Sequence, residues 1–435
     1  MKMTMKAAAA AVMAVCAASA AHAAGFMLTE QSAGALGRAY AGVGVDGTDI
    51  SGVYYNPATM TLHPGTKIQA GFVAVGLDLA FEGSGSADDV NYDGVTENGQ
   101  YNTQAIPHGY ISHQLTDSMW IGLAMTVPFG MGTEYKDDWP LANRGISAEV
   151  LTFDFNPNVA WKVSDKLSLG AGMSIQYAAA DLKMQDKPLG LSVNGEVDAD
   201  SIAWGFNVGV MWSPLENLRF GLSYRSRVNH NADGDFTLSG GNAIVDGALG
   251  TLGLAQGVPY DATATISTPA WAMATAAWDV NDLLSLYATF RWTDWSSFDT
   301  LNIKTSALDR IPGKNGVKTV ENHWQDTYLV SVGADLRFTN WWTFRAGIGY
   351  ETSAVDDPKY RTAIIPDADR LWLALGSSFK ASENMQIDVS AAWLHGIGER
   401  NLWNTDGSDG KTPQEVGKFE NLDAYLFGVQ LVYKF

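Results

Sequence analysis

The sequence is poor in cysteine, in basic residues and in long apolar runs, and each shortage excludes a class of protein. Its single cysteine, Cys16, allows no disulfide within the chain. Basic residues number 28 against 47 acidic ones, so the net charge of −19 argues against nucleic acid as a partner. After residue 23, no stretch reaches the roughly 18 consecutive apolar residues of a membrane-spanning helix. The sequence therefore excludes a helical membrane protein.

The first 23 residues have the pattern of an export signal. Lys2 and Lys6 precede a short alanine-rich apolar core, and a small-x-small cleavage pattern ends at Ala23. We expect residues 1–23 to be a signal peptide, whose removal also takes away Cys16. An exported chain without disulfides needs another way to close its fold, and a β-barrel provides one.

Period-two alternation is the main structural signal of the remaining chain. Segments 218–225, 283–293 and 342–350 each place apolar side chains on one face and polar ones on the other. In 283–293, for example, Leu286 and Phe290 lie on one face and Arg291 on the other. Such faces could equally belong to a soluble sandwich, where the apolar side forms the core.

The lengths of the connections favour the membrane. Six short polar turns alternate with seven long loops rich in Gly and Asp, which predicts an all-β, 14-stranded antiparallel transmembrane barrel over residues 66–435. An even strand number, short periplasmic turns and long outer loops are typical of outer-membrane barrels. The turns are 116–118, 164–166, 215–217, 281–282, 339–340 and 382–384, and the loops are 82–103, 129–146, 183–200, 230–262, 299–320, 352–367 and 397–419.

Aromatic residues gather near the short turns, as expected for an interfacial belt. The chain also ends in an amphipathic strand that closes on Phe435. Both features predict that the short turns lie at one membrane interface. The tryptophans near these turns are Trp120, Trp161, Trp212, Trp278, Trp341 and Trp342.

Residues 24–65 form a small-residue, glycine-rich segment that precedes the first predicted strand at 66–75. A fourteen-strand barrel is too wide for its own side chains to fill, so an unplugged lumen would leak. The segment has the size and the conformational freedom of an internal plug. We therefore expect it to be a hatch inside the lumen.

Several motifs follow one another along nearly the whole chain. They are AGFMLTEQSAGALGRAYAG (24–42), NPA (56–58), TVPFGMGTEY (126–135), NPNVAWKVSDKLSLGAG (156–172), LSYRS (222–226), WTDWSSF (292–298), IPDADRLWLALG (365–376) and the terminal strand. Together these motifs closely resemble the long-chain fatty acid outer-membrane transporter (FadL) family. The resemblance implies an N-terminal hatch, passive uptake of hydrophobic molecules, capture at the outer loops, and sideways release through a kink in the third strand.

The resemblance implies that the hatch Asn56, Pro57 and Ala58 pack against this kink. Pro128, which cannot donate to the ladder, and Gly130 give the third predicted strand a physical basis for a kink. The alternative is that Pro128 merely ends the strand at its outer rim.

Basic residues are the candidates for meeting an anionic ligand headgroup. Alternation turns several arginines away from lipid, where each either pairs with a lumen acid or grips a carboxylate. The family places cations on the fifth strand's outer end and before the tenth, and Lys183 and Lys318 are nearest, although Val320 is the best-matched position near the second. The ligand-binding candidates are Lys183, Lys318, Arg225, Arg291, Arg345, Arg370 and Trp372.

Other motifs do not predict chemistry. Residues 42–47 match G-x-G-x-x-G without the flanking strand and helix of a dinucleotide site. Residues 89–100 nearly match a calcium loop, but Gln100 replaces the bidentate Glu. The histidines have no metal spacing, and no G-x-S-x-G elbow is present. We therefore expect no cofactor, no metal site and no enzymatic activity.

Three functions remain open. The first is uptake of long-chain fatty acids, by a monomer set among outer-membrane lipid and lipopolysaccharide. The second is uptake of aromatic hydrocarbons, which some members of the family carry. The third, of a different class, is a general diffusion porin for small polar solutes, for which an open lumen is expected. A receptor role of the outer loops could coexist with any of these.

Overall fold

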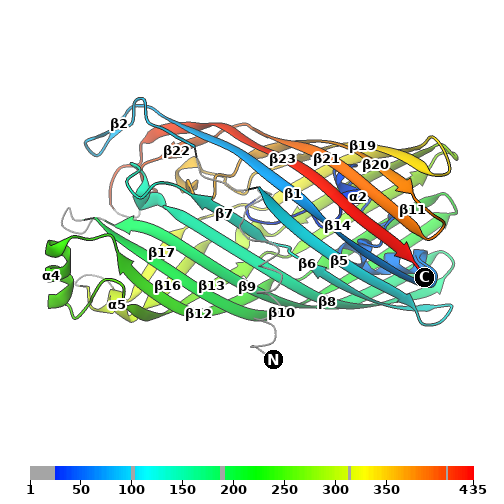
Figure 1. Ribbon diagram of the computed structural model, residues 1–435, viewed down its shortest axis with the longest axis horizontal. Coiled ribbons are helices and arrows are strands. Elements are labelled where there is room, and N and C mark those ends of the chain that lie inside the picture. The colour runs from blue at the N-terminus through cyan, green and yellow to red at the C-terminus, as the bar shows by residue number, and fades with distance from the viewer. Residues whose placement is uncertain (1–24, 99–102, 187–191, 312–314, 408–409) are drawn as a thin grey trace.

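The computed structural model describes residues 25–98, 103–186, 192–311, 315–407 and 410–435. The predicted signal peptide lies outside the described residues. One large antiparallel sheet curls into a closed barrel (Figure 1), in which β1 (Thr66–Gly83) pairs with β5 (Gln104–Gln114) on one side and with β23 (Glu415–Lys434) on the other. Within the described residues, no helix has the length and apolar character needed to cross a membrane.

In the described part of the chain the wall consists of fourteen strands, several of which are interrupted and carry two labels. The all-β, 14-stranded antiparallel architecture predicted from alternation is therefore confirmed. The other segments of the barrel sheet are β4 (Thr96–Asn98), β6 (Met119–Thr126), β7 (Gly130–Glu134), β8 (Ser147–Ser164), β9 (Leu167–Asp186), β10 (Val193–Leu215), β11 (Leu218–Arg225), β12 (Val228–Ser239), β13 (Pro259–Thr268), β14 (Trp271–Asp279), β15 (Leu284–Thr293), β16 (Thr300–Thr305), β17 (Val317–Glu321), β18 (Thr327–Arg337), β19 (Trp342–Glu351), β20 (Asp369–Lys380), β21 (Met385–Ile397) and β22 (Asn401–Trp403).

The apolar faces of the strands point outward, the reverse of a soluble sandwich. Leu222, Phe290 and Ile348 are 63%, 46% and 46% exposed, whereas Arg291 and Arg345 on the opposite faces are at most 4% exposed. A wall of exposed apolar side chains is stable only against lipid. Alternation thus predicted both the strands and the face that each one buries.

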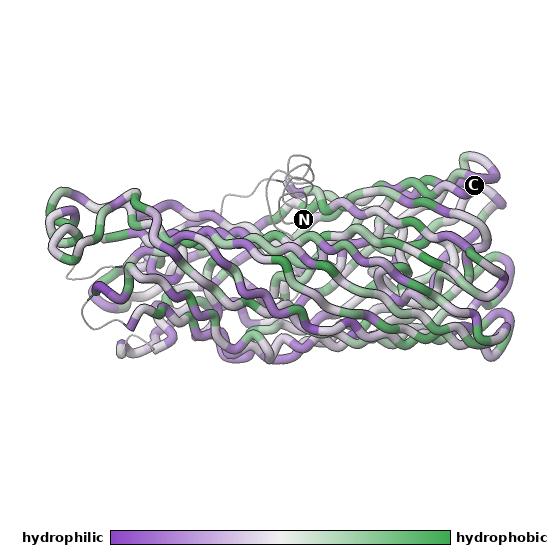
Figure 2. Tube along the Cα trace, turned by 90° about the horizontal axis from the view of Figure 1, so that it is seen from below, coloured by the Kyte–Doolittle hydropathy of each residue, from purple (hydrophilic) through white to green (hydrophobic). Residues whose placement is uncertain are grey.

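Aromatic side chains mark the membrane interface at the short-turn end. Trp161, Trp212, Trp278 and Trp341 are each about half exposed near the short turns. Figure 2 shows hydrophilic turns at this end, where the C-terminus also lies. Trp120 is an exception to the predicted belt, since it is buried and its Nε1 donates to the His63 carbonyl, 2.9 Å away.

At the opposite end the strands run farther than predicted. The described residues of 183–200, 230–262 and 299–320, predicted as loops, are largely β-structure together with the helices α4 (Ala243–Thr251) and α5 (Ser306–Asp309). The prediction failed there because polar residues replace apolar ones on the outward face while the strands continue. One cross-strand row consists of carboxylates directly opposite one another, on Glu149, Asp181, Asp198, Asp235 and Asp261.

This acidic row locates the outer boundary of the membrane. Like charges directly opposite one another repel and are tolerated only when water solvates them. The wall beyond the row therefore stands outside the hydrocarbon. Smaller elements at this end are β2 (Ser86–Ala87), β3 (Val90–Asn91), and the 3₁₀ turns η2 (Ala142–Arg144), η4 (Trp295–Ser297) and η5 (Pro358–Tyr360).

Residues 25–65, called here the N-terminal segment, lie inside the ring of strands (Figure 1). The segment contains α2 (Ala33–Leu36), α3 (Gly52–Tyr55) and the 3₁₀ helix η1 (Pro57–Leu62), and β1 follows at Thr66. Most of it is buried, and among its residues Gly47, Thr48 and a few near 61–65 reach solvent. The barrel core is therefore this segment packed against the inward faces of the strands.

Candidate functional site

The third strand is broken at the position that the sequence singled out. Residues 127–129 separate β6 from β7, and Pro128 lies in this break. The β6 strand pairs with both β5 and β8, whereas the described pairings of β7 are all with β8. Residues 105–108 of β5 pair with β1 but not with β7. The ladder is thus interrupted between β5 and β7, and Gly130 begins the strand beyond the break.

The N-terminal segment supplies the hydrogen bonds that the break lacks. The Leu28 amide donates to the Pro128 carbonyl at 2.8 Å, and the Gly130 amide donates to the Phe26 carbonyl at 2.9 Å. The Gln31 side chain extends this contact, since its Nε2 donates to the Val127 carbonyl at 2.7 Å. Residues 26–31 therefore act as a short β-partner that covers the break from inside.

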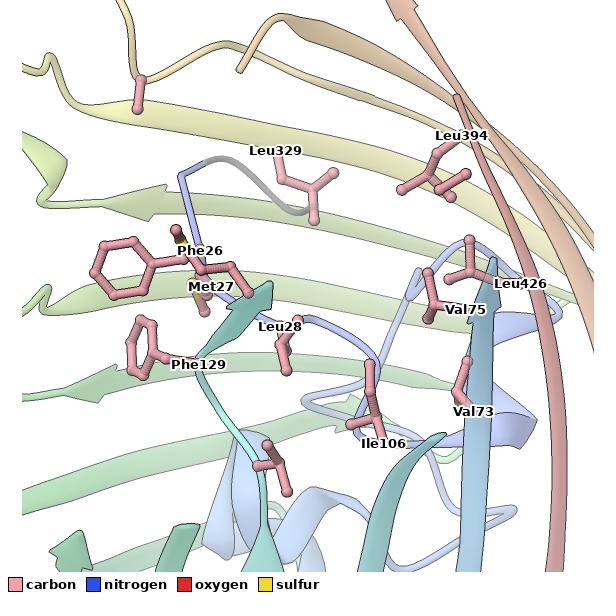
Figure 3. Close-up of a cluster of buried hydrophobic side chains, with 14 of the residues drawn as sticks. Phe26, Met27, Leu28, Val73, Val75, Ile106, Phe129, Leu329, Leu394 and Leu426 are labelled. Carbon is pink, nitrogen blue, oxygen red and sulfur yellow. The ribbon is translucent and has the colours of Figure 1, made fainter. Parts of the chain in front are cut away.

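An apolar compartment adjoins this covered break. Figure 3 shows Phe26, Met27 and Leu28 beside Phe129, facing side chains from the opposite arc of the wall. Aromatic rings extend the compartment on one side, because Phe26 lies 4.8 Å from the ring of Trp295. Other buried members labelled in Figure 3 are Val73, Val75, Ile106, Leu329, Leu394 and Leu426.

Two predicted arginines, Arg291 and Arg370, lie together in a charged cluster beside the N-terminal segment. Arg291 Nη2 lies 2.8 Å from Glu351 Oε1, and Arg370 Nη1 lies 3.9 Å from Glu351 Oε2. Arg370 also pairs with Asp367, and Arg291 Nη1 donates to Thr29 Oγ1 at 2.9 Å. All four charged side chains are nearly inaccessible to water. The cluster therefore balances two cations with two anions.

Glu30 is a fifth buried group at this cluster, and sequence reasoning missed it. The side chain is 0% exposed, and no other residue in the described part of the chain donates to either carboxyl oxygen. Burial raises the pKa of Glu30 to about 8, although Arg370, Arg291 and its own backbone N–H lower it. The physical cause is desolvation, which disfavours the charged form of an acid. No local pattern distinguishes a buried Glu within an irregular segment.

Arg345 and Arg225 hold the N-terminal segment to the wall. Arg345 donates to the Gly34 carbonyl and to Thr48 Oγ1, each at 3.1 Å. Arg225 donates to the Tyr54 carbonyl at 3.1 Å. Both guanidinium groups also pair with wall acids, Asp388 with Arg345 and Asp154 with Arg225. These arginines point inward as predicted, and their contacts support an anchoring role.

Arg38 forms a further anchor that the sequence did not single out. Its guanidinium pairs with Asp46 and Asp335 and lies 4.1 Å from the centre of the Tyr287 ring. A Cβ at Gly347 would stand 2.2 Å from the Arg38 carbonyl carbon, so the wall needs glycine there. The two charges at Arg38 and Asp335 lie far apart in sequence, which hides their pairing from local patterns.

The Asn-Pro-Ala motif lies away from the break. Asn56 Nδ2 donates to the Gly44 carbonyl at 2.9 Å and to the Val210 carbonyl of β10 at 3.0 Å. A Cβ at Gly170 of β9 would stand 2.4 Å from the Ala58 amide nitrogen. Pro57 also lies against these two strands. The expectation that the motif packs against the kink is therefore wrong, since residues 26–31 occupy that place.

The other ligand-binding candidates occupy three different environments. Lys183 shares the outward face of β9 with Asp181, and its Nζ lies 2.8 Å from Asp137 Oδ1, so this position does not support a role in the lumen. Lys318 pairs in register with the buried Ile303 and is itself exposed near an apolar cluster at the outer end. Trp372 is buried.

The ring of Trp372 lies 5.8 Å from the ring of Tyr40, edge to face, and Trp372 Nε1 has no partner among the described residues. Trp372 therefore packs against the N-terminal segment, close to Arg370 on the same strand.

The calcium-like loop uses its side chains within the chain. Asp93 Oδ1 accepts from the Gly85 amide, and Asn91 Oδ1 accepts from the Asp93 amide. Gln100 lies outside the described residues. Among the described residues, no group of His, Cys, Asp and Glu has the arrangement of a metal site.

Comparison with known proteins places this fold and site in a family. A family model described as "Outer membrane protein transport protein (OMPP1/FadL/TodX)" matches residues 14–435. The chain is 27% identical to a long-chain fatty acid transport protein of Escherichia coli O6:H1 over 95% of this chain and 94% of the relative. It is 25% identical to outer membrane protein P1 of Haemophilus influenzae, over 96% of this chain and 97% of that one.

Solved structures agree on the fold. A FadL homologue of Pseudomonas aeruginosa superposes with a TM-score of 0.82 at 24% identity, covering 95% of this chain and 100% of that one. The toluene transporter TodX of Pseudomonas putida gives 0.69 at 16% identity, over 95% and 100%. The resemblance identified from the motifs is thus confirmed, and the chain belongs to the OMPP1/FadL/TodX family of outer-membrane transporters of hydrophobic compounds.

Proposed function

We propose that the protein takes up long-chain fatty acids and releases them sideways into the outer membrane through the break in the third strand. The observation that carries the proposal is the interrupted ladder between β5 and β7, covered from inside by residues 26–31 and bordered by an apolar compartment. Fatty acid is favoured because the relative of Escherichia coli O6:H1 is named a long-chain fatty acid transport protein. In this proposal residues 1–23 direct export and residues 24–65 are the hatch.

Sideways release follows from the physics of an apolar tail. Each methylene that leaves an apolar environment for water costs about 0.8 kcal/mol. A tail that passes from the compartment through the wall into lipid avoids this cost, whereas a route into the periplasm would incur it along the whole tail. Pro128 interrupts the ladder because it has no amide hydrogen to donate, and Gly130, which packs poorly, begins β7 directly beyond the break.

The arginine cluster favours a carboxylate cargo over a plain hydrocarbon. Arg291 and Arg370 lie on neighbouring arcs of the wall beside Leu329, which belongs to the apolar compartment. A headgroup held at these arginines would leave its tail among apolar side chains. Lys318, at the outer end beside an apolar cluster, is the matching candidate for first capture.

Aromatic hydrocarbons remain the second candidate, and one observation favours them. Phe26, Phe129, Trp295, Phe298 and Trp324 pack ring against ring at the compartment, with centroid distances of 4.8–6.3 Å among them. Such a cluster suits a flat ring as well as a chain. Competition of toluene with labelled oleate for uptake separates the two candidates.

A general diffusion porin is disfavoured by the packing of the lumen. A cavity of about 690 Å³ opens at the short-turn end, and the residues Gly47 and Thr48 of the N-terminal segment line it. On the side of Gly47 and Thr48 that faces away from the short turns, the N-terminal segment fills the ring of strands. We propose that the protein acts as a monomer among lipid and lipopolysaccharide, and steady ion conductance of the purified wild-type protein in a planar bilayer would refute the closed lumen.

A reversible lock on the break tests the proposal. Met27 and Phe129 form an antiparallel bridge whose flanking hydrogen bonds make them a non-hydrogen-bonded pair. Such pairs bring Cα atoms to about 4.5 Å, within reach of a disulfide. The double variant Met27→Cys/Phe129→Cys, with Cys16→Ser, should take up oleate when reduced and lose uptake when oxidised.

The matched control is the single variant Met27→Cys, which oxidation should leave unaffected. Uptake by the oxidised double variant at the reduced rate would refute release through the break.

A further inference from the structure

Glu30 stands apart from the other buried acids of the described residues because its carboxyl oxygens meet no hydrogen-bond donor from another residue. Asp154 accepts from Arg225 and Ser174, and Asp388 accepts from Arg345 and Ser378. Neither oxygen of Glu30 accepts from another residue that the structure describes. An unpaired carboxylate without donors is costly in such a place, so the neutral acid is the stable form.

The surroundings of Glu30 are charge-balanced without it. Arg291 and Arg370 offset Glu351 and Asp367, so an ionised Glu30 would leave one net negative charge buried. Two further titratable groups face it from its own segment, the hydroxyls of Tyr40 and Tyr55, which are also buried. Burial holds the pKa of Glu30 at about 8, so it carries its proton at neutral pH.

The position of Glu30 links the arginine cluster to the break. The preceding Thr29 accepts from Arg291, and the following Gln31 donates to the Val127 carbonyl at the break. Leu28, two residues earlier, belongs to the apolar compartment. Along the chain, Glu30 therefore lies between a residue that contacts the arginines and a residue that contacts the break.

We propose that Glu30 gives its proton to the carboxylate of the cargo as the cargo moves from the arginine cluster to the break, so that it enters the bilayer as the neutral acid. The inference rests on the proposed function, since it needs a carboxylate cargo. The O–H bond of Glu30 breaks and an O–H bond forms on the cargo. The Glu30 carboxylate then stays beside Arg291 and Arg370 until water returns a proton.

The chemical need for this step is set by the bilayer. Moving an ionised carboxylate into hydrocarbon is strongly unfavourable, whereas a carboxylic acid loses only its hydrogen bonds to water. A proton supplied at the exit removes the charge before the headgroup enters the hydrocarbon. Glu30 is then a proton donor, and its removal should affect cargoes that arrive charged and spare those that do not.

The test compares oleate with oleyl alcohol, which has a similar chain and no charge. Cells whose only transporter of this family is the full-length protein are given each labelled compound, and initial uptake rates are measured for wild type, Glu30→Gln, Glu30→Asp and Glu216→Gln. The Gln variant keeps the size of Glu30 and cannot give up a proton. Glu216 is exposed in a short turn and serves as the matched control.

We expect Glu30→Gln to lower oleate uptake about a hundredfold, the lower end of the range for losing a general acid, with oleyl alcohol uptake unchanged. Glu30→Asp should recover part of the oleate rate, and Glu216→Gln should match wild type. If Glu30→Gln lowers the uptake rates of oleate and oleyl alcohol equally, or lowers neither, the inference is overturned and the proposed function is not. A wild-type protein that takes up oleyl alcohol but not oleate refutes carboxylate cargo and the inference with it.

Discussion

Replacing Arg345 by Met should loosen the N-terminal segment and make the closed barrel leak. Arg345 is 1% exposed and donates to the Gly34 carbonyl and Thr48 Oγ1, which lie 14 positions apart in the segment. The substitution removes these two bonds and leaves Asp388 buried without its cation. Breaking a buried ion pair by removing one partner costs about 3–5 kcal/mol.

The lower end of this range applies, because Asp388 keeps donors from Gln386 and Gln430. If the substitution destabilises the closed state by about 3 kcal/mol relative to the open state, the open fraction rises about a hundredfold, since each 1.4 kcal/mol changes the equilibrium constant by a factor of ten. Other anchors, including Arg38 and Arg225, should keep the openings brief. The assay is the frequency of conductance events of the purified variant in a planar bilayer.

The matched control is Arg337→Met on the neighbouring strand. Arg337 is partly exposed and donates to Asp279 and Ser285 instead of to the N-terminal segment. It should therefore behave like wild type. If folded Arg345→Met and Arg337→Met proteins show the same low frequency of openings, the reasoning that Arg345 holds the segment closed is refuted.

Three further predictions follow from burial, lipid exposure and charge. Leu222→Arg should destabilise the barrel by about 2–4 kcal/mol in a urea titration, because Leu222 faces lipid and is 63% exposed. The control Ile244→Arg should cost almost nothing, because Ile244 is 68% exposed on α4, beyond the acidic row. Equal effects of the two substitutions would contradict the assigned membrane position. Gly209→Val should displace Asn56, since even a Cβ at Gly209 would stand 2.0 Å from Asn56 Oδ1, and limited proteolysis should then cut the N-terminal segment faster. The control is Gly247→Val, which should leave the cleavage rate unchanged because nothing lies within 4 Å of a Cβ at Gly247. Burial raises the pKa of Glu30 from 4.5 to about 8, so packing of the segment is strongest below pH 4.5 and weakens as pH rises toward 8. Hydrogen exchange of residues 26–31, corrected for its intrinsic pH dependence, should therefore become faster with rising pH in wild type and not in Glu30→Gln. The same dependence of the exchange rate on pH in both proteins would contradict this prediction.

The sequence predicted the lipid-facing surface well because one physical rule governs it. Every residue of a membrane strand faces either lipid or lumen, so period-two alternation in 218–225, 283–293 and 342–350 assigns both faces at once. The same rule failed beyond the acidic row. There both faces meet water or loops, and the strands of 183–200 continue without the apolar signal.

The interior could be predicted only in outline. Alternation turned Arg345 and Arg291 inward, but Arg38 and Asp335 meet across 297 positions, which no local pattern encodes. Trp120 and Trp161 both lie near predicted short turns, so the sequence predicts the same position for both. Trp120 instead donates a hydrogen bond to the N-terminal segment, whereas Trp161 faces the membrane interface. The kink followed from Pro128, whereas its partner followed only from the tertiary path of residues 26–31.

The central claim, that cargo leaves sideways at the break, can be tested by mapping where cargo lies as it exits. Oleic acid bearing a photoreactive group at its tail is bound to the full-length protein in lipid nanodiscs, irradiated, and located by peptide mass spectrometry. The account predicts adducts on residues 105–108 and 127–131, which flank the break. Adducts concentrated instead around Gly47, Lys67 and Lys434, which line the cavity at the short-turn end, would show release toward the periplasm and contradict it.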